Sequence, residues 1–172
     1  MNKHGKKLLS EIQTNKVTAV QILAHLEKKH TQKPCRDIHH PALQDAFYAE
    51  VKSGKTIPGL LRLDAVAIKK SWHKPCITGY EIKVGRSDFL RGKETALKQY
   101  TKYCHEFYFV SPPGVVTLDD LSSPEHGDVG LLYYSPEHDT LFTKRRAMRR
   151  EIDLRSPEVC SMLMYLVMYR CG

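Results

Sequence analysis

The stretch from Asp64 to Tyr103 reads DAVAIKKSWHKPCITGYEIKVGRSDFLRGKETALKQYTKY, and its first half holds two apolar runs separated by a polar turn. Two such runs joined by a short turn predict an antiparallel β-hairpin. Side chains alternate between the two faces of a strand, so Glu81 and Lys83 share one face of the second run. Asp64 stands at the head of the first run. The pattern therefore predicts two carboxylates and one ammonium group at one place.

This combination of side chains suits a divalent cation with oxygen ligands. Hydrolysis of a phosphodiester needs an aligned water and a group that neutralises charge on the phosphate oxygens, and metal ions supply both. Mg²⁺ or Mn²⁺ is expected rather than Zn²⁺, because neither His nor Cys belongs to the pattern. Each residue alone has an ordinary explanation, since Glu-x-Lys in a strand is commonly a cross-strand salt bridge. Together they predict a metal-dependent nuclease.

The residues also resemble a known superfamily. Asp64, Glu81-x-Lys83 and Gln99-x-x-x-Tyr103 look like the PD-(D/E)XK nucleases, and the last pair resembles the QxxxY motif of their RecB-type branch. In that branch the matching residues support the active site and contact the nucleic acid. Gln99 and Tyr103 are one helical turn apart and would share a helix face. The alternative is that Tyr103 belongs to the core and Gln99 to the solvated surface.

The run from Arg62 to Gly114 is similar to the MmcB-like DNA repair family, with EIKVGRSDFLRGKE followed by YCHEFYFVSPPG. Leu63 stands where the superfamily name has a proline before the aspartate. The resemblance implies an α/β domain of restriction-endonuclease-like fold, with a central mixed β-sheet flanked by helices. It also implies a role in DNA repair, replication or phage DNA metabolism.

The resemblance assigns roles to individual residues. The aspartate, the glutamate and the carbonyl between glutamate and lysine hold the metal in this superfamily, which here implies Asp64, Glu81 and Ile82. The lysine, here Lys83, orients the attacking water.

A further acidic ligand often lies on the helix before the first strand of such nucleases. We expect a helix over residues 41–53, because Pro41 suits a first-turn position and Gly54 ends the segment. Glu50 on this helix is the candidate ligand, and Asp45 is its competitor. An ordinary surface glutamate is the alternative for Glu50.

The chain of 172 residues is expected to form a single domain over 1–172, with residues 1–40 as a helical N-terminal extension. A helix over residues 17–29 with Thr18 as its cap belongs to that extension. Strands are expected near residues 106–112, 129–135 and 141–148, and a closing helix from Pro157. We expect the loop over residues 116–128 to be mobile.

The charge of the chain favours a polyanionic partner. Lys and Arg outnumber Asp and Glu by 27 to 19, which gives a net charge of +8 and a pI near 9.2. Arg145, Arg146, Arg149 and Arg150 lie in a run with Lys144 and are predicted to contact DNA phosphates. A solvated charge run is the alternative.

Arg86, Ser87 and Asp88 lie where the helix after the Glu-x-Lys strand is expected to begin. The start of a helix offers free backbone N–H groups to a phosphate, and Arg86 adds a potential bidentate contact. Arg86 and Ser87 are therefore predicted to bind nucleic acid. The compatible alternative makes Asp88 a helix cap paired with Arg86.

Other features bound the class of protein. The five cysteines are odd in number and contain no Cys-x-x-Cys pair, which indicates reduced thiols in a cytoplasmic protein, associated with the nucleoid if bacterial. We see no signal peptide, and the longest apolar stretch falls short of the roughly 18 residues that span a bilayer, so no membrane role is expected.

Two other functions stay open. A basic DNA-binding module can keep a nuclease fold without turnover, although loss of a motif residue would be its simplest sign. A restriction enzyme or a junction resolvase shares the same core but recognises DNA differently. A symmetric cut by such an enzyme would require a homodimer.

Overall fold

The computed structural model describes residues 17–32, 45–51, 63–71 and 73–170. Within these ranges six strands form one sheet whose spatial order follows the chain. The strands are β1 (Ala46–Val51), β2 (Leu63–Lys69), β3 (Cys76–Ile82), β4 (Glu106–Ser111), β5 (Gly130–Ser135) and β6 (Thr140–Arg145). The described α-helices are α2 (Ala19–Thr31), α3 (Arg86–Tyr100) and α4 (Pro157–Arg170), and short 3₁₀ turns occur at Thr101–Tyr103, Asp119–Leu121 and Pro124–His126.

The sheet is mixed. β1, β2 and β3 are antiparallel neighbours, β3, β4 and β5 run parallel, and β6 returns antiparallel to β5. The helix α3 lies between the parallel strands β3 and β4 in the chain, as a parallel crossover requires. This architecture confirms the expected α/β class with a central mixed sheet flanked by helices, and it confirms the β2–β3 hairpin.

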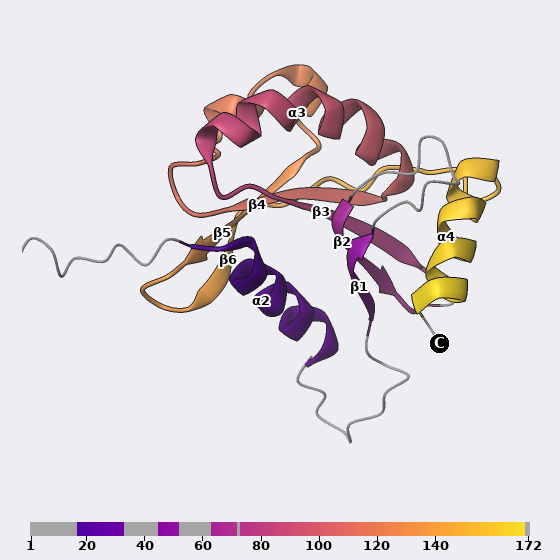
Figure 1. The fold of residues 1–172 in the computed structure, drawn as a ribbon. Helices are drawn as coiled ribbons and strands as arrows, with labels where there is room; N and C mark the ends of the chain where they lie inside the picture. The colour runs from indigo at the N-terminus through magenta and orange to yellow at the C-terminus, as the bar shows by residue number, and fades with distance from the viewer. Residues whose placement is uncertain (1–16, 33–44, 52–62, 72, 171–172) are drawn as a thin grey trace, which may run out of the picture.

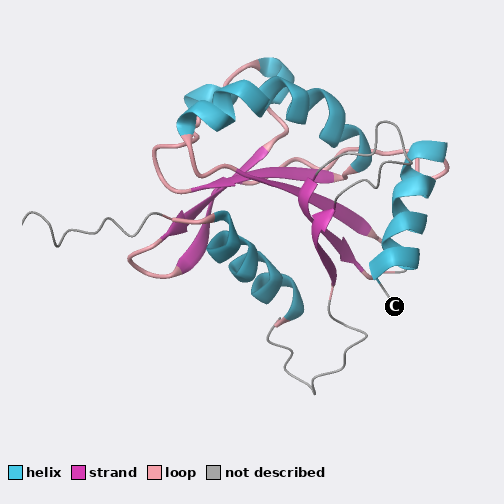
Figure 2. Cartoon of the chain, viewed as in Figure 1, coloured by secondary structure: helices cyan, strands magenta, loops and turns pink. Residues whose placement is uncertain are grey.

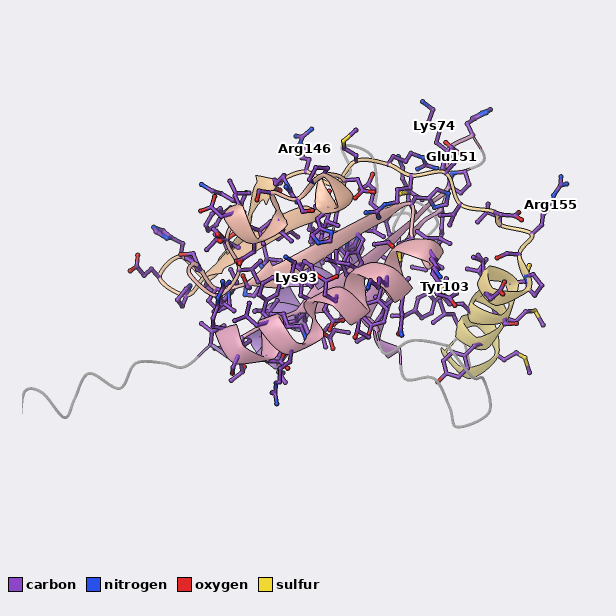
Figure 3. All side chains as sticks on the ribbon, turned by 90° about the horizontal axis from the view of Figure 1, so that it is seen from above. Lys74, Lys93, Tyr103, Arg146, Glu151 and Arg155 are labelled. Atoms are coloured by element: carbon purple, nitrogen blue, oxygen red, sulfur yellow. The ribbon has the colours of Figure 1, made fainter. Side chains whose placement is uncertain are left out.

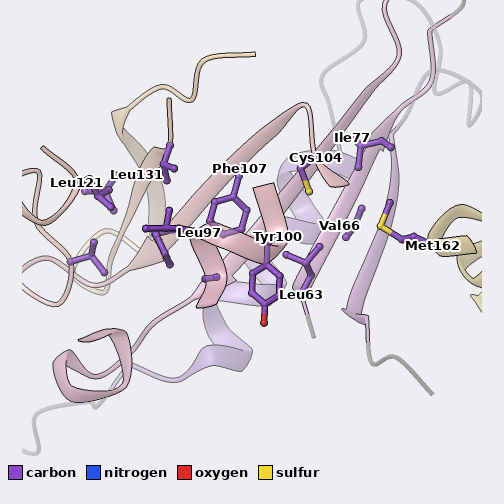
Figure 4. Packing of buried hydrophobic residues seen from close by; sticks show 14 of the residues in the cluster. Leu63, Val66, Ile77, Leu97, Tyr100, Cys104, Phe107, Leu121, Leu131 and Met162 are labelled. Carbon is purple, nitrogen blue, oxygen red and sulfur yellow. The ribbon is translucent and has the colours of Figure 1, made fainter. Parts of the chain in front are cut away.

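Helices cover both faces of the sheet. Figures 1 and 2 show α3 above the sheet, α2 below it and α4 beside β1. The larger core lies on the α3 side, where Phe89 of α3 meets Phe109 of β4 edge-to-face with ring centroids 5.3 Å apart. Figure 4 shows the same core continuing through Phe107 and Tyr100 to Leu63 and to Met162 of α4. Apolar burial on both faces explains why the central strands are almost wholly buried.

The helix α2 begins where its cap residue predicts. Thr18 and Gln21 form a capping box, in which each side chain bonds the backbone of the other residue. Ile22 and Leu26 are fully buried against the sheet, one helical turn apart. The predicted helix is therefore confirmed, but it is a layer of the fold rather than an appendage.

The helix expected over residues 41–53 is wrong in its described part, because Ala46–Val51 is strand β1. Phe47 packs against the core on the α2 side, and Tyr48 packs against the core on the α3 side. Alternation puts these two neighbours on opposite faces, which a helix cannot do. Pairing with the apolar strand β2 thus outweighs the local helix signals of Pro41 and Gly54.

Candidate active site

The hairpin brings the two predicted carboxylates together. Ala65 of β2 pairs with Tyr80 of β3, so the next pair along this antiparallel register is Asp64 and Glu81. Oδ2 of Asp64 accepts a hydrogen bond of 2.6 Å from the backbone N–H of Ile82. The N–H and C=O of a strand residue point toward the same neighbouring strand, so the Ile82 carbonyl lies on the Asp64 side as well.

Glu81 and Lys83 form a buried ion pair. Each residue is only 7% exposed, and Lys83 Nζ lies 3.0 Å from Glu81 Oε1. The second carboxylate oxygen of Glu81, Oε2, is buried and has no hydrogen-bond partner among the described residues. A buried acceptor without a partner costs about 1–3 kcal/mol, so a fold keeps one only where something offsets it.

The electrostatics of this pair are shifted. Burial, followed by the charge of Asp64, raises the pKa of Glu81 to about 7, although Lys83 acts in the opposite direction. Burial lowers the pKa of Lys83, but the carboxylates of Glu81 and Asp88 outweigh it, and the pKa of Lys83 lies above its usual value. Burial and, after it, the neighbouring Asp64 carboxylate thus bring the pKa of Glu81 close to neutral pH.

Asp88 takes part in this site rather than capping α3. The N-cap of α3 is Gly85, and Asp88 lies in the first turn of the helix. Its Oδ2 accepts from Lys83 Nζ at 3.1 Å, while half of the Asp88 side chain stays exposed. The predicted pairing with Arg86 is wrong, because Asp88 binds Lys83 and Arg86 binds Asp120.

Glu50 lies on β1 and not on a helix. Ala49 pairs with Ala65 and Val51 with Leu63, so the backbone of residue 50 lies across from that of Asp64. The backbone of residue 50 thus lies near the site, as part of a strand rather than of the predicted helix. Its competitor lies elsewhere, since Asp45 is buried next to His30 on the α2 side of the sheet.

The donor set fits one class of metal ion. Among the described residues no three His, Cys, Asp or Glu side chains converge closely enough to form a metal cluster. Asp64, Glu81 and the Ile82 carbonyl offer hard oxygen atoms, and Glu81 Oε2 is one without a partner in the described ranges. Mg²⁺ is held in many proteins by one or two carboxylates while it keeps several waters, so these residues fit Mg²⁺ or Mn²⁺ better than Zn²⁺.

Arg86 has a structural task. Its guanidinium donates to both oxygens of Asp120 at 2.5 and 2.7 Å and to the Val115 carbonyl at 3.0 Å. It also lies over the Phe89 ring, 5.5 Å from the centroid. These contacts fix the loop that was expected to be mobile onto the start of α3. Ser87 is exposed, and its predicted contact with nucleic acid stays a prediction.

Most of the basic run is also engaged within the protein. Arg145 donates to the carbonyls of Val129, Leu121 and His126 at 2.7, 2.9 and 3.0 Å. Arg150 pairs with Asp128 through Nε, and Arg149 donates to the Pro75 carbonyl at 2.8 Å. Burial lowers the pKa of Arg145, as expected for a half-buried cation that serves as a structural donor.

Lys144 and Arg146 are exposed, and neither side chain has a hydrogen bond or ion pair among the described residues, unlike Arg145, Arg149 and Arg150. Figure 3 shows Arg146 projecting away from the chain. These two residues are the better candidates for phosphate contacts in the run.

Gln99 and Tyr103 do not share one α-helix, because α3 ends at Tyr100 and Tyr103 belongs to the following 3₁₀ turn. Gln99 is exposed, whereas Tyr103 is half-buried against the larger core. Figure 3 shows Tyr103 at the end of α3 that lies nearest α4. Burial, followed by the charge of Glu158 on α4, raises the pKa of Tyr103. The supporting role of this pair stays a prediction.

A second polar cluster was missed from the sequence. His30 of α2 is hydrogen-bonded through Nδ1 to Asp45 and through Nε2 to Tyr80 of β3, each at 2.7 Å. One signal was available, because Ile22, Leu26 and His30 recur every four residues and so lie on one helix face.

Comparisons with known proteins give the fold and little else. No family model matches the chain, and no curated protein matches it. A solved structure of a protein of unknown function from Silicibacter pomeroyi is similar, with a TM-score of 0.55 and 14% sequence identity over 90% of this chain and 84% of that one. At this identity the likeness supports the α/β architecture alone. None of the described helices is long and apolar enough to cross a membrane.

Proposed function

We propose that this chain is a metal-dependent nuclease that hydrolyses phosphodiester bonds in DNA, acts in the cytoplasm and belongs to the PD-(D/E)XK superfamily near the MmcB-like proteins. The observation that carries the proposal is the buried cluster in which Asp64 faces Glu81 while Lys83 bridges to Glu81 at 3.0 Å. The resemblance names Asp64, Glu81 and Lys83, and the hairpin that brings these three residues to one place supports the proposal.

The energetics favour a functional explanation of the cluster. Burying the Glu81 carboxylate beside a second, half-buried carboxylate is unfavourable, and the raised pKa of Glu81 reflects that cost. A purely structural ion pair would need only Glu81 and Lys83, and Asp64 adds repulsion to it. Strongly shifted carboxyl groups beside a charge partner are typical of functional sites.

Asp64, Glu81 and the Ile82 carbonyl would hold the metal ion. When bound, a divalent cation lowers the pKa of a coordinated water and offsets charge on the phosphate. Asp64 and Glu81 contribute the negative charge that attracts the cation. Lys83 presents an ammonium beside Glu81, where it is placed to stabilise charge that develops on the phosphate oxygens.

DNA as the partner is supported by the net charge of +8 and by the exposed cations Lys144 and Arg146. Repair, replication or phage DNA metabolism is the proposed setting. Cutting could depend on the structure of the DNA or on its sequence. The forms of DNA that the protein cleaves distinguish these two possibilities.

The test is incubation with single-stranded, duplex, flapped and four-way DNA, with and without Mg²⁺ or Mn²⁺, and with Asp64→Asn as the matched control. We expect cleavage of at least one form by the wild-type protein, dependent on the metal and absent in the variant. Binding without cleavage on every form would instead support a DNA-binding module. Cleavage restricted to four-way DNA with dimer formation would indicate a junction resolvase.

A further inference from the structure

Gly92 lies within the helix α3, where helix propensity disfavours glycine relative to alanine. A Cβ built on Gly92 would lie 3.2 Å from Lys83 Nζ and 3.7 Å from Lys83 Cε. The first distance is tighter than ordinary contacts, so a side chain here would require the Lys83 ammonium to shift. Gly92 therefore leaves room for Lys83 beneath the helix.

Asp88 lies one helical turn before Gly92 and on the same face of α3. Its Oδ2 is 3.1 Å from Lys83 Nζ, whereas its other oxygen is 3.9 Å from Arg91. The contact with Lys83 is the shorter of the two. The face of α3 that covers Lys83 thus combines an acceptor for the ammonium with a position that makes space for it.

The sheet holds Lys83 at both its backbone and its ammonium group. Its backbone N–H donates to the Val110 carbonyl of β4 at 2.9 Å, and its Nζ meets Glu81 Oε1 at 3.0 Å. The ammonium is therefore held between Glu81 of the sheet and Asp88 of α3. Lys83 is 7% exposed, so its position depends on these contacts rather than on solvent.

We propose that Asp88 and Gly92 are positioning residues that together hold the Lys83 ammonium against Glu81. This inference rests on the proposed function for its purpose, since positioning matters where Lys83 acts on a phosphate. It does not rest on that function for its geometry. The competing explanation is that Asp88 merely interacts with the N-terminus of α3, as acidic residues in a first turn commonly do.

The first experiment observes Lys83 without any substrate. In ¹H–¹⁵N spectra, an ammonium held by two carboxylates in a buried site exchanges its protons slowly with water, and its signal is assigned by its disappearance in Lys83→Met. We expect Asp88→Asn to speed this exchange at least tenfold and Asp88→Glu to restore it partly. Glu94→Gln, which removes an exposed carboxylate from the same helix, should leave the signal unchanged.

Gly92→Ala is the second variant, and it should shift or broaden the Lys83 signal because the new methyl group crowds the ammonium. Thermal unfolding of each variant reports whether the fold persists. An unchanged Lys83 signal in both Asp88→Asn and Gly92→Ala would overturn the proposal. A wild-type protein without a slowly exchanging Lys83 signal would overturn it as well.

Cleavage then separates this inference from the proposed function. We expect Asp88→Asn to lower kcat at least tenfold with less than a twofold change in KM, because positioning acts on the chemical step. Wild-type cleavage with an unchanged kcat in Asp88→Asn would contradict the positioning role while the nuclease assignment survives. If the wild-type protein cleaves no DNA, the nuclease assignment fails and the exchange rates still decide whether α3 holds Lys83.

Discussion

The strand β3 carries a buried polar residue on each face, and the two surroundings differ. On the α2 side, Tyr80 belongs to a back cluster with His30 and Asp45, in which both ring nitrogens of His30 are hydrogen-bonded at 2.7 Å. The His30 ring also stacks on Phe47 with centroids 5.8 Å apart. The hydrogen bond between His30 and Tyr80 connects α2 to the sheet.

On the α3 side, Glu81 belongs to a front cluster with Asp64, Lys83 and Asp88. The carboxylates of Glu81 and Asp88 share the Lys83 ammonium there, Asp64 adds a third carboxylate nearby, and Glu81 Oε2 has no partner among the described residues. Satisfied polar networks specify a fold, whereas a cluster with excess charge of one sign needs another reason to persist. The comparison therefore separates a structural cluster from one that we propose to be functional, on the same strand.

The largest expected effect is on cleavage in the front cluster. Asp64→Asn and Glu81→Gln each remove an anionic ligand while keeping the side-chain shape, and we expect DNA cleavage to fall at least about a hundredfold. Rates with Mg²⁺ on the best substrate measure the effect, and thermal unfolding checks the fold. A variant that cuts at the wild-type rate would remove its residue from the site.

A substitution in the back cluster should lower the stability of the fold rather than the rate of cleavage. His30→Ala removes two hydrogen bonds from buried groups, and we expect the free energy of unfolding to fall by about 2–4 kcal/mol. Urea denaturation measures the change. Cleavage per folded molecule should stay at the wild-type value, because the back cluster lies on the other face of β3. A specific decrease in turnover in a folded His30→Ala protein would break the distinction between the clusters.

The pKa of Glu81 predicts a pH dependence of stability without metal. The folded-state pKa of about 7 lies above the ordinary value of 4.5, so the folded state binds the extra proton between these values. Stability should therefore fall as pH rises from about 4.5 to 7, by a few kcal/mol at most. Denaturation in buffer with a chelator, compared with Glu81→Gln, isolates this contribution. An equal slope in the variant would assign it to other groups.

The smallest expected effect concerns the basic run. Lys144→Gln combined with Arg146→Gln should weaken binding to all DNA sequences and lower the salt dependence by about 0.9 in log-log slope for each phosphate that is no longer neutralised. Arg145→Gln is the contrasting variant, because its three hydrogen bonds to carbonyls predict a decrease in thermal stability instead. Salt titrations of binding that give the wild-type slope for the double variant would make Lys144 and Arg146 ordinary surface cations.

Local sequence patterns were sufficient for part of this structure. Two apolar runs joined by a polar turn predicted the β2–β3 hairpin, and with it the meeting of Asp64, Glu81 and Lys83. Thr18 marked the start of α2, because capping by a side chain depends only on residues nearby in the chain. These features depend on residues within one or two turns or across one hairpin.

Long-range partners were not available from the sequence. Strand β1 was mistaken for a helix because its identity depends on pairing with β2. Arg145 was assigned to DNA because its backbone acceptors lie 16 to 24 residues away. Asp88 was assigned as a cap because its partner, Lys83, is reached only when α3 folds back over the sheet. In each case tertiary contacts decided between two locally reasonable alternatives.

Titration calorimetry of Mn²⁺ binding at pH 7.5 tests the central claim most directly, because the front cluster is proposed to bind a metal ion. The account predicts that Asp64→Asn and Glu81→Gln weaken Mn²⁺ binding at least about tenfold. Asp45→Asn, which alters a buried carboxylate of the back cluster, should bind Mn²⁺ as the wild-type protein does. Equal affinity in the wild-type protein and in Asp64→Asn would contradict the account.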